Sequence, residues 1–191
     1  WDLVKRKQLY SLQEHQSAIR GIDILRTSEE DFMVISGGRD DILNVYFMTS
    51  SQSRNRKTMK VEKTIPTGLQ IEACGLINNN YLYSAGGDGV FNVYNIEANG
   101  KPLFNTAKPL EDLFVVGVIP QFFDMTFNEV IGFHLVYSDQ TISKIDIKNI
   151  FDKSNDTIPI TYNIAGNHGT IADMRFVGPG LNKLALATNS N

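Results

Sequence analysis

Few residues in this chain have both the type and the spacing that catalysis or metal binding requires. The three histidines lie in different parts of the sequence, and the single cysteine, Cys74, sits among apolar residues. Zinc sites need several thiolate, imidazole or carboxylate ligands close together, so the sequence predicts no metal centre and a buried, reduced Cys74. It also contains no Gly-x-x-x-x-Gly-Lys-Ser/Thr phosphate loop, Gly-x-Ser-x-Gly elbow or His-Glu-x-x-His pair. We therefore expect a protein that is not an enzyme and that holds no cofactor.

The segment Asp152-Lys-Ser154-Asn-Asp156 has the alternating oxygen ligands that begin a calcium-binding loop. Such a loop also needs a glycine at its sixth position and a bidentate glutamate at its twelfth. This chain has Thr157 and Asn163 at those two positions. The segment therefore predicts a polar turn between strands and not a calcium site.

The overall composition is that of an ordinary globular protein. Hydrophobic residues make up 42% of the chain and charged residues 20%, and the net charge of −3 is too small to predict a nucleic-acid-binding or membrane-binding surface overall. No apolar run reaches the roughly 18–20 residues of a membrane span. No secretory signal is visible at the N-terminus, and one cysteine allows no disulfide framework, so we expect an intracellular protein.

One short sequence pattern recurs along the chain at a nearly constant interval. Residues 36–46 return as residues 84–94, a weaker copy begins at Ser138, and a fourth begins at Ala187. The matching residues Asp40, Asp88, Asp139 and Asn189 are 48, 51 and 50 positions apart. A period of this size indicates stacked copies of one supersecondary unit, which bury a core only as an array.

Within each copy, two sets of residues alternate with the period of a β-strand. In the first copy, Ile42, Asn44 and Tyr46 alternate with Leu43, Val45 and Phe47, and the glycine pairs Gly37-Gly38 and Gly86-Gly87 predict a tight turn before the strand. Four short strands fit in each complete unit, with no helical periodicity. The predicted strands are 19–25, 32–36, 42–46, 59–65, 71–77, 82–84, 90–94, 102–105, 113–120, 134–138, 141–145, 158–162 and 171–177.

Four strands in a unit of 40–50 residues are typical of a β-propeller blade. The fold class predicted is therefore all-β, a partial propeller with about three whole blades and fragments at both ends. We expect residues 1–13 to end a preceding blade, residues 14–65, 66–105 and 106–162 to form three blades, and residues 163–191 to begin a further one. Three blades do not close a ring, so we expect the chain to belong to a longer protein.

His15, Ser36, Asp40 and Tyr46 follow one another at intervals of 21, 4 and 6 residues, and this order resembles the WD40 family. In that family a His, a Ser or Thr, an Asp and a Trp at these positions form a hydrogen-bonded tetrad inside the blade. The resemblance implies a structural role for these four residues and for their counterparts in the second unit, which are Ser84, Asp88 and Tyr94. A tyrosine hydroxyl can replace the indole donor of the tryptophan. The tetrads are degraded elsewhere: the second unit has Thr67 or Gly68 in place of the histidine, and the third has Ile145 in place of the tryptophan.

A more particular resemblance covers most of residues 60–190. Residues 71–75, 108–114, 138–141, 164–179 and 181–190 are similar to the transducin-beta-like protein three family, the U3 snoRNP-associated tandem WD40 propellers of the small-subunit processome. The chain departs from that family at Asn191, where the family tends to have proline. The resemblance implies a non-enzymatic scaffold of the UTP-B subcomplex. The localisation that it implies is the nucleus, and within it the nucleolus. Its implied partners are the other propeller subunits, pre-ribosomal RNA and the U3 snoRNP, and its implied role is pre-ribosomal RNA processing and 40S subunit assembly.

One polar segment has an excess of positive charge. Residues 50–63 contain five basic residues and one acidic residue, and they fall between the third and fourth predicted strands. The segment is either a solvated loop or a contact to RNA phosphates through Arg54, Arg56, Lys57 and Lys60. The alternative function is a WD40 adaptor that binds peptides in signalling, coat or ubiquitin-ligase assemblies.

Overall fold

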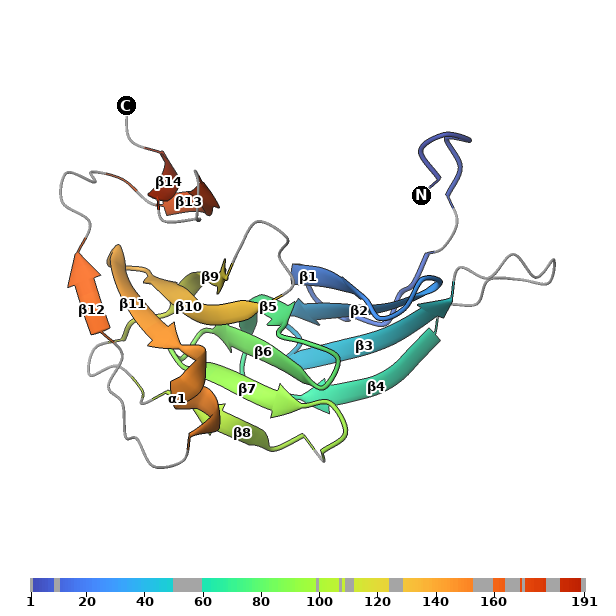
Figure 1. Ribbon diagram of the computed structural model, residues 1–191, viewed down its shortest axis with the longest axis horizontal. Helices are drawn as coiled ribbons and strands as arrows, with labels where there is room; N and C mark the ends of the chain where they lie inside the picture. Colours follow the sequence, from blue (N-terminus) through green and yellow to red (C-terminus); the bar gives the residue numbers. More distant parts are fainter. Residues whose placement is uncertain are drawn as a thin grey trace.

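The structure is a computed structural model of the 191-residue chain. It describes residues 2–8, 11–49, 60–98, 100–106, 108, 112–123, 129–152, 160–163, 169, 171–177 and 183–189. In this part of the chain, fourteen strands are joined by turns and by one short helix, α1 (Ile147–Phe151) (Figure 1). The protein is therefore all-β, as the sequence predicts, and α1 is neither long nor apolar enough to cross a membrane.

The strands form antiparallel sheets in which chain order equals spatial order. The first sheet contains β1 (Ile19–Arg26), β2 (Asp31–Gly38), β3 (Ile42–Thr49) and β4 (Lys60–Pro66). The second contains β5 (Ile71–Leu76), β6 (Tyr81–Gly86), β7 (Phe91–Asn95) and β8 (Pro102–Asn105). The third contains β9 (Val115–Phe122), β10 (Val130–Tyr137), β11 (Thr141–Asp146) and β12 (Ile160–Asn163), and β13 (Ile171–Val177) pairs with β14 (Lys183–Thr188).

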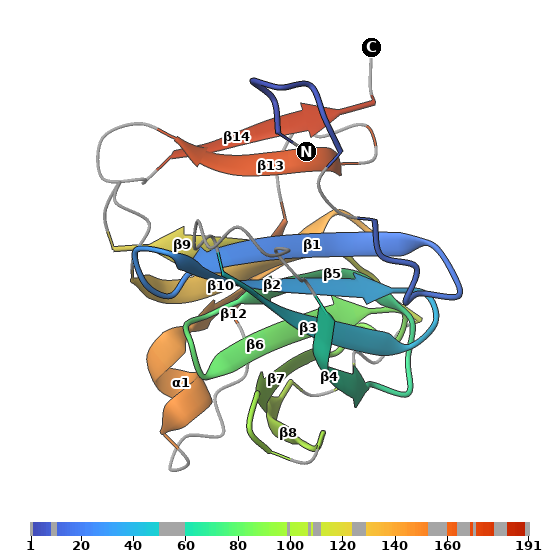
Figure 2. The same ribbon diagram turned by 90° about the vertical axis from the view of Figure 1, so that its right-hand side faces the viewer.

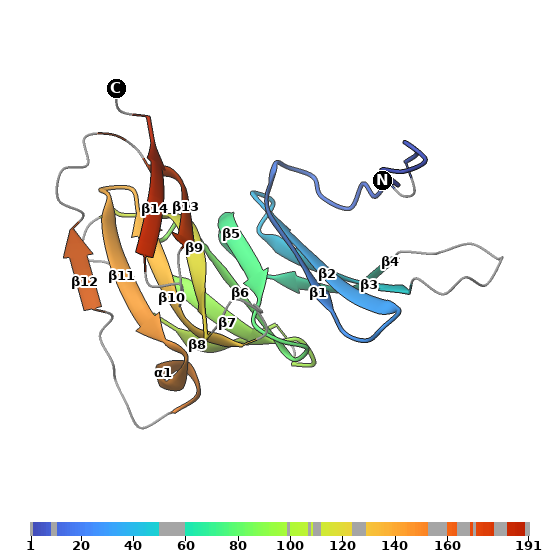
Figure 3. The same ribbon diagram turned by 45° about the horizontal axis from the view of Figure 1, so that its top comes forward.

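The sheets follow one another side by side, as Figure 3 shows. Their first strands are in contact in succession, β1 with β5, β5 with β9 and β9 with β13, while β4, β8 and β12 lie at the outer edges. Figure 2 shows β13 and β14 beyond β9, separate from the other strands of the third sheet. This arrangement of four-stranded antiparallel sheets around their first strands is consistent with part of a WD40 β-propeller. The limits of the individual blades stay a prediction.

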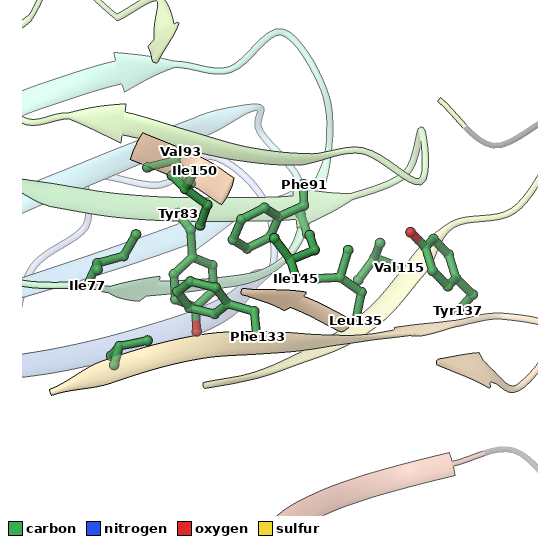
Figure 4. Packing of buried hydrophobic residues seen from close by; sticks show 12 residues of the cluster. Ile77, Tyr83, Phe91, Val93, Val115, Phe133, Leu135, Tyr137, Ile145 and Ile150 are labelled. Atoms are coloured by element: carbon green, nitrogen blue, oxygen red, sulfur yellow. The ribbon is translucent and has the colours of Figure 1, made fainter. Parts of the chain in front are cut away.

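Hydrophobic cores fill the spaces between successive sheets. The core between the second and third sheets is built around three aromatic rings, Tyr83, Phe91 and Phe133, whose centroids are 5.0–5.5 Å apart (Figure 4). Phe91 and Phe133 are fully buried, and each such side chain contributes about 1.5–3 kcal/mol to folding. The second sheet is covered on both sides and buries apolar side chains on both faces: Leu82 of β6 lies in the core with the first sheet and Tyr83 in the core with the third.

All thirteen predicted strands are present, with ends that differ by a few residues, and the structure adds β14. One detail of the prediction was wrong. Gly37 and Gly38 were expected to form the turn, but both belong to β2, and the chain turns through Arg39 and Asp41, which has a positive φ of 63°. A Cβ atom on Gly37 would lie 3.0 Å from Cys74 Sγ on the second sheet, so this glycine is needed for close packing between sheets.

Candidate functional site

The structure brings together the four candidate tetrad residues of the first unit. The Nε2 atom of His15 lies 2.7 Å from the Ser36 hydroxyl, and that hydroxyl lies 3.1 Å from the hydroxyl of Tyr46. On the other side of the imidazole ring, Nδ1 lies 3.0 Å from Oδ1 of Asp40. The chain of contacts links the segment before β1 to β2, to β3 and to the turn between those strands. We call these four residues the first-sheet polar cluster.

Burial and hydrogen bonds act in opposite directions on the Asp40 carboxyl. Burial raises its pKa, but the hydrogen bonds from His15 and from the N–H of Gln16, together with the charge of His15, outweigh this effect and hold the pKa below its ordinary value. An ionised carboxylate only accepts hydrogen bonds, so Nδ1 of His15 carries the proton that points to Asp40. When the imidazole is neutral, Nε2 accepts from the Ser36 hydroxyl, which in turn accepts from Tyr46.

The order of contacts Asp40–His15–Ser36 is also that of a Ser-His-Asp catalytic triad. A nucleophile must be reached by a substrate carbonyl, whereas Ser36 is 4% exposed and its oxygen is already in contact with the Tyr46 hydroxyl. The side chains of His15 and Asp40 are only 4% and 9% exposed. This geometry fits a hydrogen-bond network within the sheet better than it fits nucleophilic catalysis.

The second and third units contain fewer of these contacts. Ser84 and Tyr94 share a hydrogen bond, and Oδ1 of Asp88 accepts from the N–H of Val90 at 3.0 Å. Thr67, at the position of the missing histidine, donates its hydroxyl to the carbonyl oxygens of Asp41 and Leu69. In the third unit Asp139 accepts from the N–H and the hydroxyl of Thr141. The link across the sheet that His15 provides is specific to the first sheet among the described residues.

The candidate RNA contacts lie outside the described residues. Arg54, Arg56 and Lys57 are not among them, and of Lys60 only the backbone, at the start of β4, is described. The last basic residue of the segment, Lys63, donates to the carbonyl oxygens of Ile96 and Ala98, the latter at 2.7 Å. Lys63 therefore joins β4 to the turn after β7, and the segment as an RNA contact stays a prediction.

The other chemical candidates are placed as follows. Cys74 is buried between the first two sheets, and burial, with the nearby charge of Asp23, raises the pKa of its thiol to about 12. The thiol is therefore protonated at neutral pH. His134 is buried in β10. His168 and residues 153–159, which include most of the calcium-like segment, lie outside the described residues. The described residues contain no group of three or more side chains suited to a metal ion.

A charged cluster that sequence reasoning missed lies between the first two sheets. The Glu72 carboxylate on β5 accepts from Nε of Arg20 at 2.8 Å and from Nε of Arg39 at 2.7 Å. Arg20 is on β1 and Arg39 is in the turn after β2. The three residues are 19 to 52 positions apart in the sequence, so only the packing of the two sheets brings them together.

Comparison with known proteins gives one informative match. None of the protein-family models compared with the chain matches it. The chain is 45% identical, over 186 residues, to a protein of the yeast Saccharomyces cerevisiae called U3 small nucleolar RNA-associated protein 13. The match covers 94% of this chain and 21% of the yeast protein, so the chain spans about a fifth of that relative's length. The resemblance to a U3-associated protein is thereby supported, and membership of the UTP-B subcomplex stays a prediction.

Proposed function

We propose that this chain is part of a non-enzymatic scaffold in the small-subunit processome, where it supports pre-ribosomal RNA processing and 40S subunit assembly. The observation that carries the proposal is the 45% identity along 94% of the chain to a protein named for its association with the U3 small nucleolar RNA. The partners proposed are other propeller subunits of the UTP-B subcomplex, pre-ribosomal RNA and the U3 snoRNP. The site of action proposed is the nucleolus.

The physical basis of such a role is a rigid array that presents loops and sheet edges to its partners. Polar contacts hold the first two sheets together in addition to their apolar core: the Asp23 carboxylate accepts from the N–H of Leu76 at 2.8 Å, and Lys63 reaches the second sheet from β4. A scaffold requires that its surfaces keep fixed relative positions, and inter-sheet contacts of this kind supply that property.

Affinity purification of the full-length protein from its own cells tests the proposal. We expect enrichment of U3 RNA, measured by reverse transcription and quantitative PCR against another small nucleolar RNA, together with other propeller proteins in the mass spectrum. Recovery of proteins that share a short peptide motif, with U3 RNA at background level, would instead support the peptide-binding adaptor and contradict the proposal.

A further inference from the structure

The charged cluster of Arg20, Glu72 and Arg39 lies at one end of the junction between the first two sheets. The pairing of β1 with β2 is irregular between Ile19 and Gly21, and the pairing of β5 with β6 is irregular between Ile71 and Ala73. Arg20 and Glu72 are the residues inside these two irregularities. Because a bulge turns a side chain away from the ordinary direction of the strand, both side chains meet across the junction.

Glu72 holds the two guanidinium groups without covering them. Its side chain is 11% exposed, while those of Arg20 and Arg39 are 48% and 46% exposed. Arg20 contacts the carboxylate through Nε alone, and Arg39 through Nε and Nη2, the latter at 2.6 Å. Within the described part of the chain, both Nη groups of Arg20 and Nη1 of Arg39 have no hydrogen-bond partner. Several N–H donors of these two guanidinium groups are thus available to a further hydrogen-bond acceptor.

The charge balance of the cluster favours an anion. Two guanidinium groups and one carboxylate leave a net charge of +1, since arginine stays protonated at all relevant pH values. The carboxylate of Asp40, next to Arg39 in the sequence, contacts His15 and the N–H of Gln16 and is not counted in this cluster. Arginine N–H pairs match the spacing of phosphate oxygens and bind them more strongly than neutral donors do.

We propose that Arg20 and Arg39 together bind a phosphate of an RNA backbone, and that Glu72 positions them for it. The choice of RNA rests on the proposed function. The cluster is separate from the candidate contacts of the basic segment, because Thr49, which precedes the segment, and Lys60, its first residue in β4, lie at the far ends of β3 and β4 from the turn that carries Arg39. Two independent parts of the first sheet would then contact phosphates.

The test measures binding of a fluorescent oligouridylate to the full-length protein over a range of salt concentrations. The main variant is Arg20→Gln/Arg39→Gln/Glu72→Gln, which removes both arginines without leaving the shielded carboxylate unpaired. We expect the slope of log affinity against log salt to fall by roughly 0.7, the value for the loss of one phosphate contact on a single strand, and affinity at low salt to fall at least about fivefold. Arg20→Gln alone keeps the pair between Arg39 and Glu72 and should lower the slope by about half as much, so it decides the question if the triple variant does not fold.

Arg26→Gln is the matched control. Arg26 is at the opposite end of β1 and donates to the carbonyl oxygens of Ser28 and Glu29, so its loss should leave the salt slope unchanged. Parental affinity in the folded triple variant, no binding of oligouridylate by the parent, or a preference of the parent for oligoglutamate would each overturn the proposal. If the full-length protein enriches U3 RNA but these substitutions do not change its RNA binding, the proposed function stands and only this inference is refuted.

Discussion

The Nε2 atom of His15 lies 2.7 Å from the hydroxyl of Ser36, although 21 residues separate them. This contact fixes the segment that precedes β1 against β2. Because Asp40 holds the other side of the imidazole ring, the same histidine also fixes the turn between β2 and β3. The first-sheet polar cluster thus connects three segments that the β-ladder alone does not connect.

Replacement of Asp40 by alanine should lower the free energy of unfolding by roughly 1–3 kcal/mol, because the buried side chain of His15 and the backbone N–H of Gln16 lose their acceptor. Denaturant unfolding of the full-length protein measures the effect. Asp88→Ala should cost less, since among the described residues Asp88 accepts only from the N–H of Val90. Asp139→Ala, in the exposed turn of the third sheet, is the control. Equal losses at all three positions would contradict the structural role of the cluster.

Gly21→Ala should destabilise the junction of the first two sheets. A Cβ atom at Gly21 would lie 2.7 Å from Cys74 Sγ and 2.8 Å from the Cys74 backbone nitrogen, and overpacking of this kind costs about 1–3 kcal/mol. Gly117→Ala is the matched control, because Gly117 occupies the same position on β9 and its Cβ would meet nothing within 4 Å. A thermal melt in which both variants behave alike would show that the first two sheets are not packed this closely.

Stability should fall as the pH is lowered from about 6.5 to about 4, through His134. Burial, and next the charge of Lys144, lower the pKa of His134 to about 4 from its ordinary 6.5, while the charge of Asp146 opposes this shift. As the pH falls, His134 is therefore protonated in the unfolded chain before it is protonated in the folded chain. The contribution of neutral His134 to the free energy of unfolding is fully present above pH 6.5, falls progressively below it, and is lost near pH 4. The loss is on the order of 3 kcal/mol. His134→Gln should flatten the dependence within this window, and an unchanged slope would exclude His134 as its source.

Neutralisation of Arg54, Arg56, Lys57 and Lys60 should weaken RNA association of the full-length protein. Removal of each phosphate contact should flatten the salt dependence by about one unit of log–log slope. Stability should stay unchanged, since Arg54, Arg56 and Lys57 fall outside the predicted strands and Lys60 is the first residue of β4. Neutralisation of Lys5, Arg6 and Lys7 is the control for a general loss of positive charge. Crosslinking to pre-ribosomal RNA at the parental level would mean that residues 50–63 are only a solvated loop.

The strands could be predicted because burial on both faces of a sheet leaves a local mark in the sequence. Alternation at residues 42–47 and the interval from Asp40 to Asp88 depend only on neighbouring residues and on the repeat. The packing role of Gly37 could not be predicted in the same way, because it depends on Cys74 in another sheet. The pairing of Glu72 with Arg20 and Arg39 and the contact of Lys63 with Ile96 could not be predicted for the same reason. Each joins residues at least 33 positions apart, and no local sequence pattern indicates which sheet faces will pack together.

The most direct measurement of the central claim is a segment exchange in yeast. In U3 small nucleolar RNA-associated protein 13, the matching fifth of the protein is replaced by this chain, and co-precipitated U3 RNA is quantified against the parental protein and against a version that lacks the segment. We predict that the chimera recovers U3 RNA at close to the parental level and well above the deletion. A chimera that accumulates normally, while its U3 RNA stays at the level of the deletion, would contradict the account.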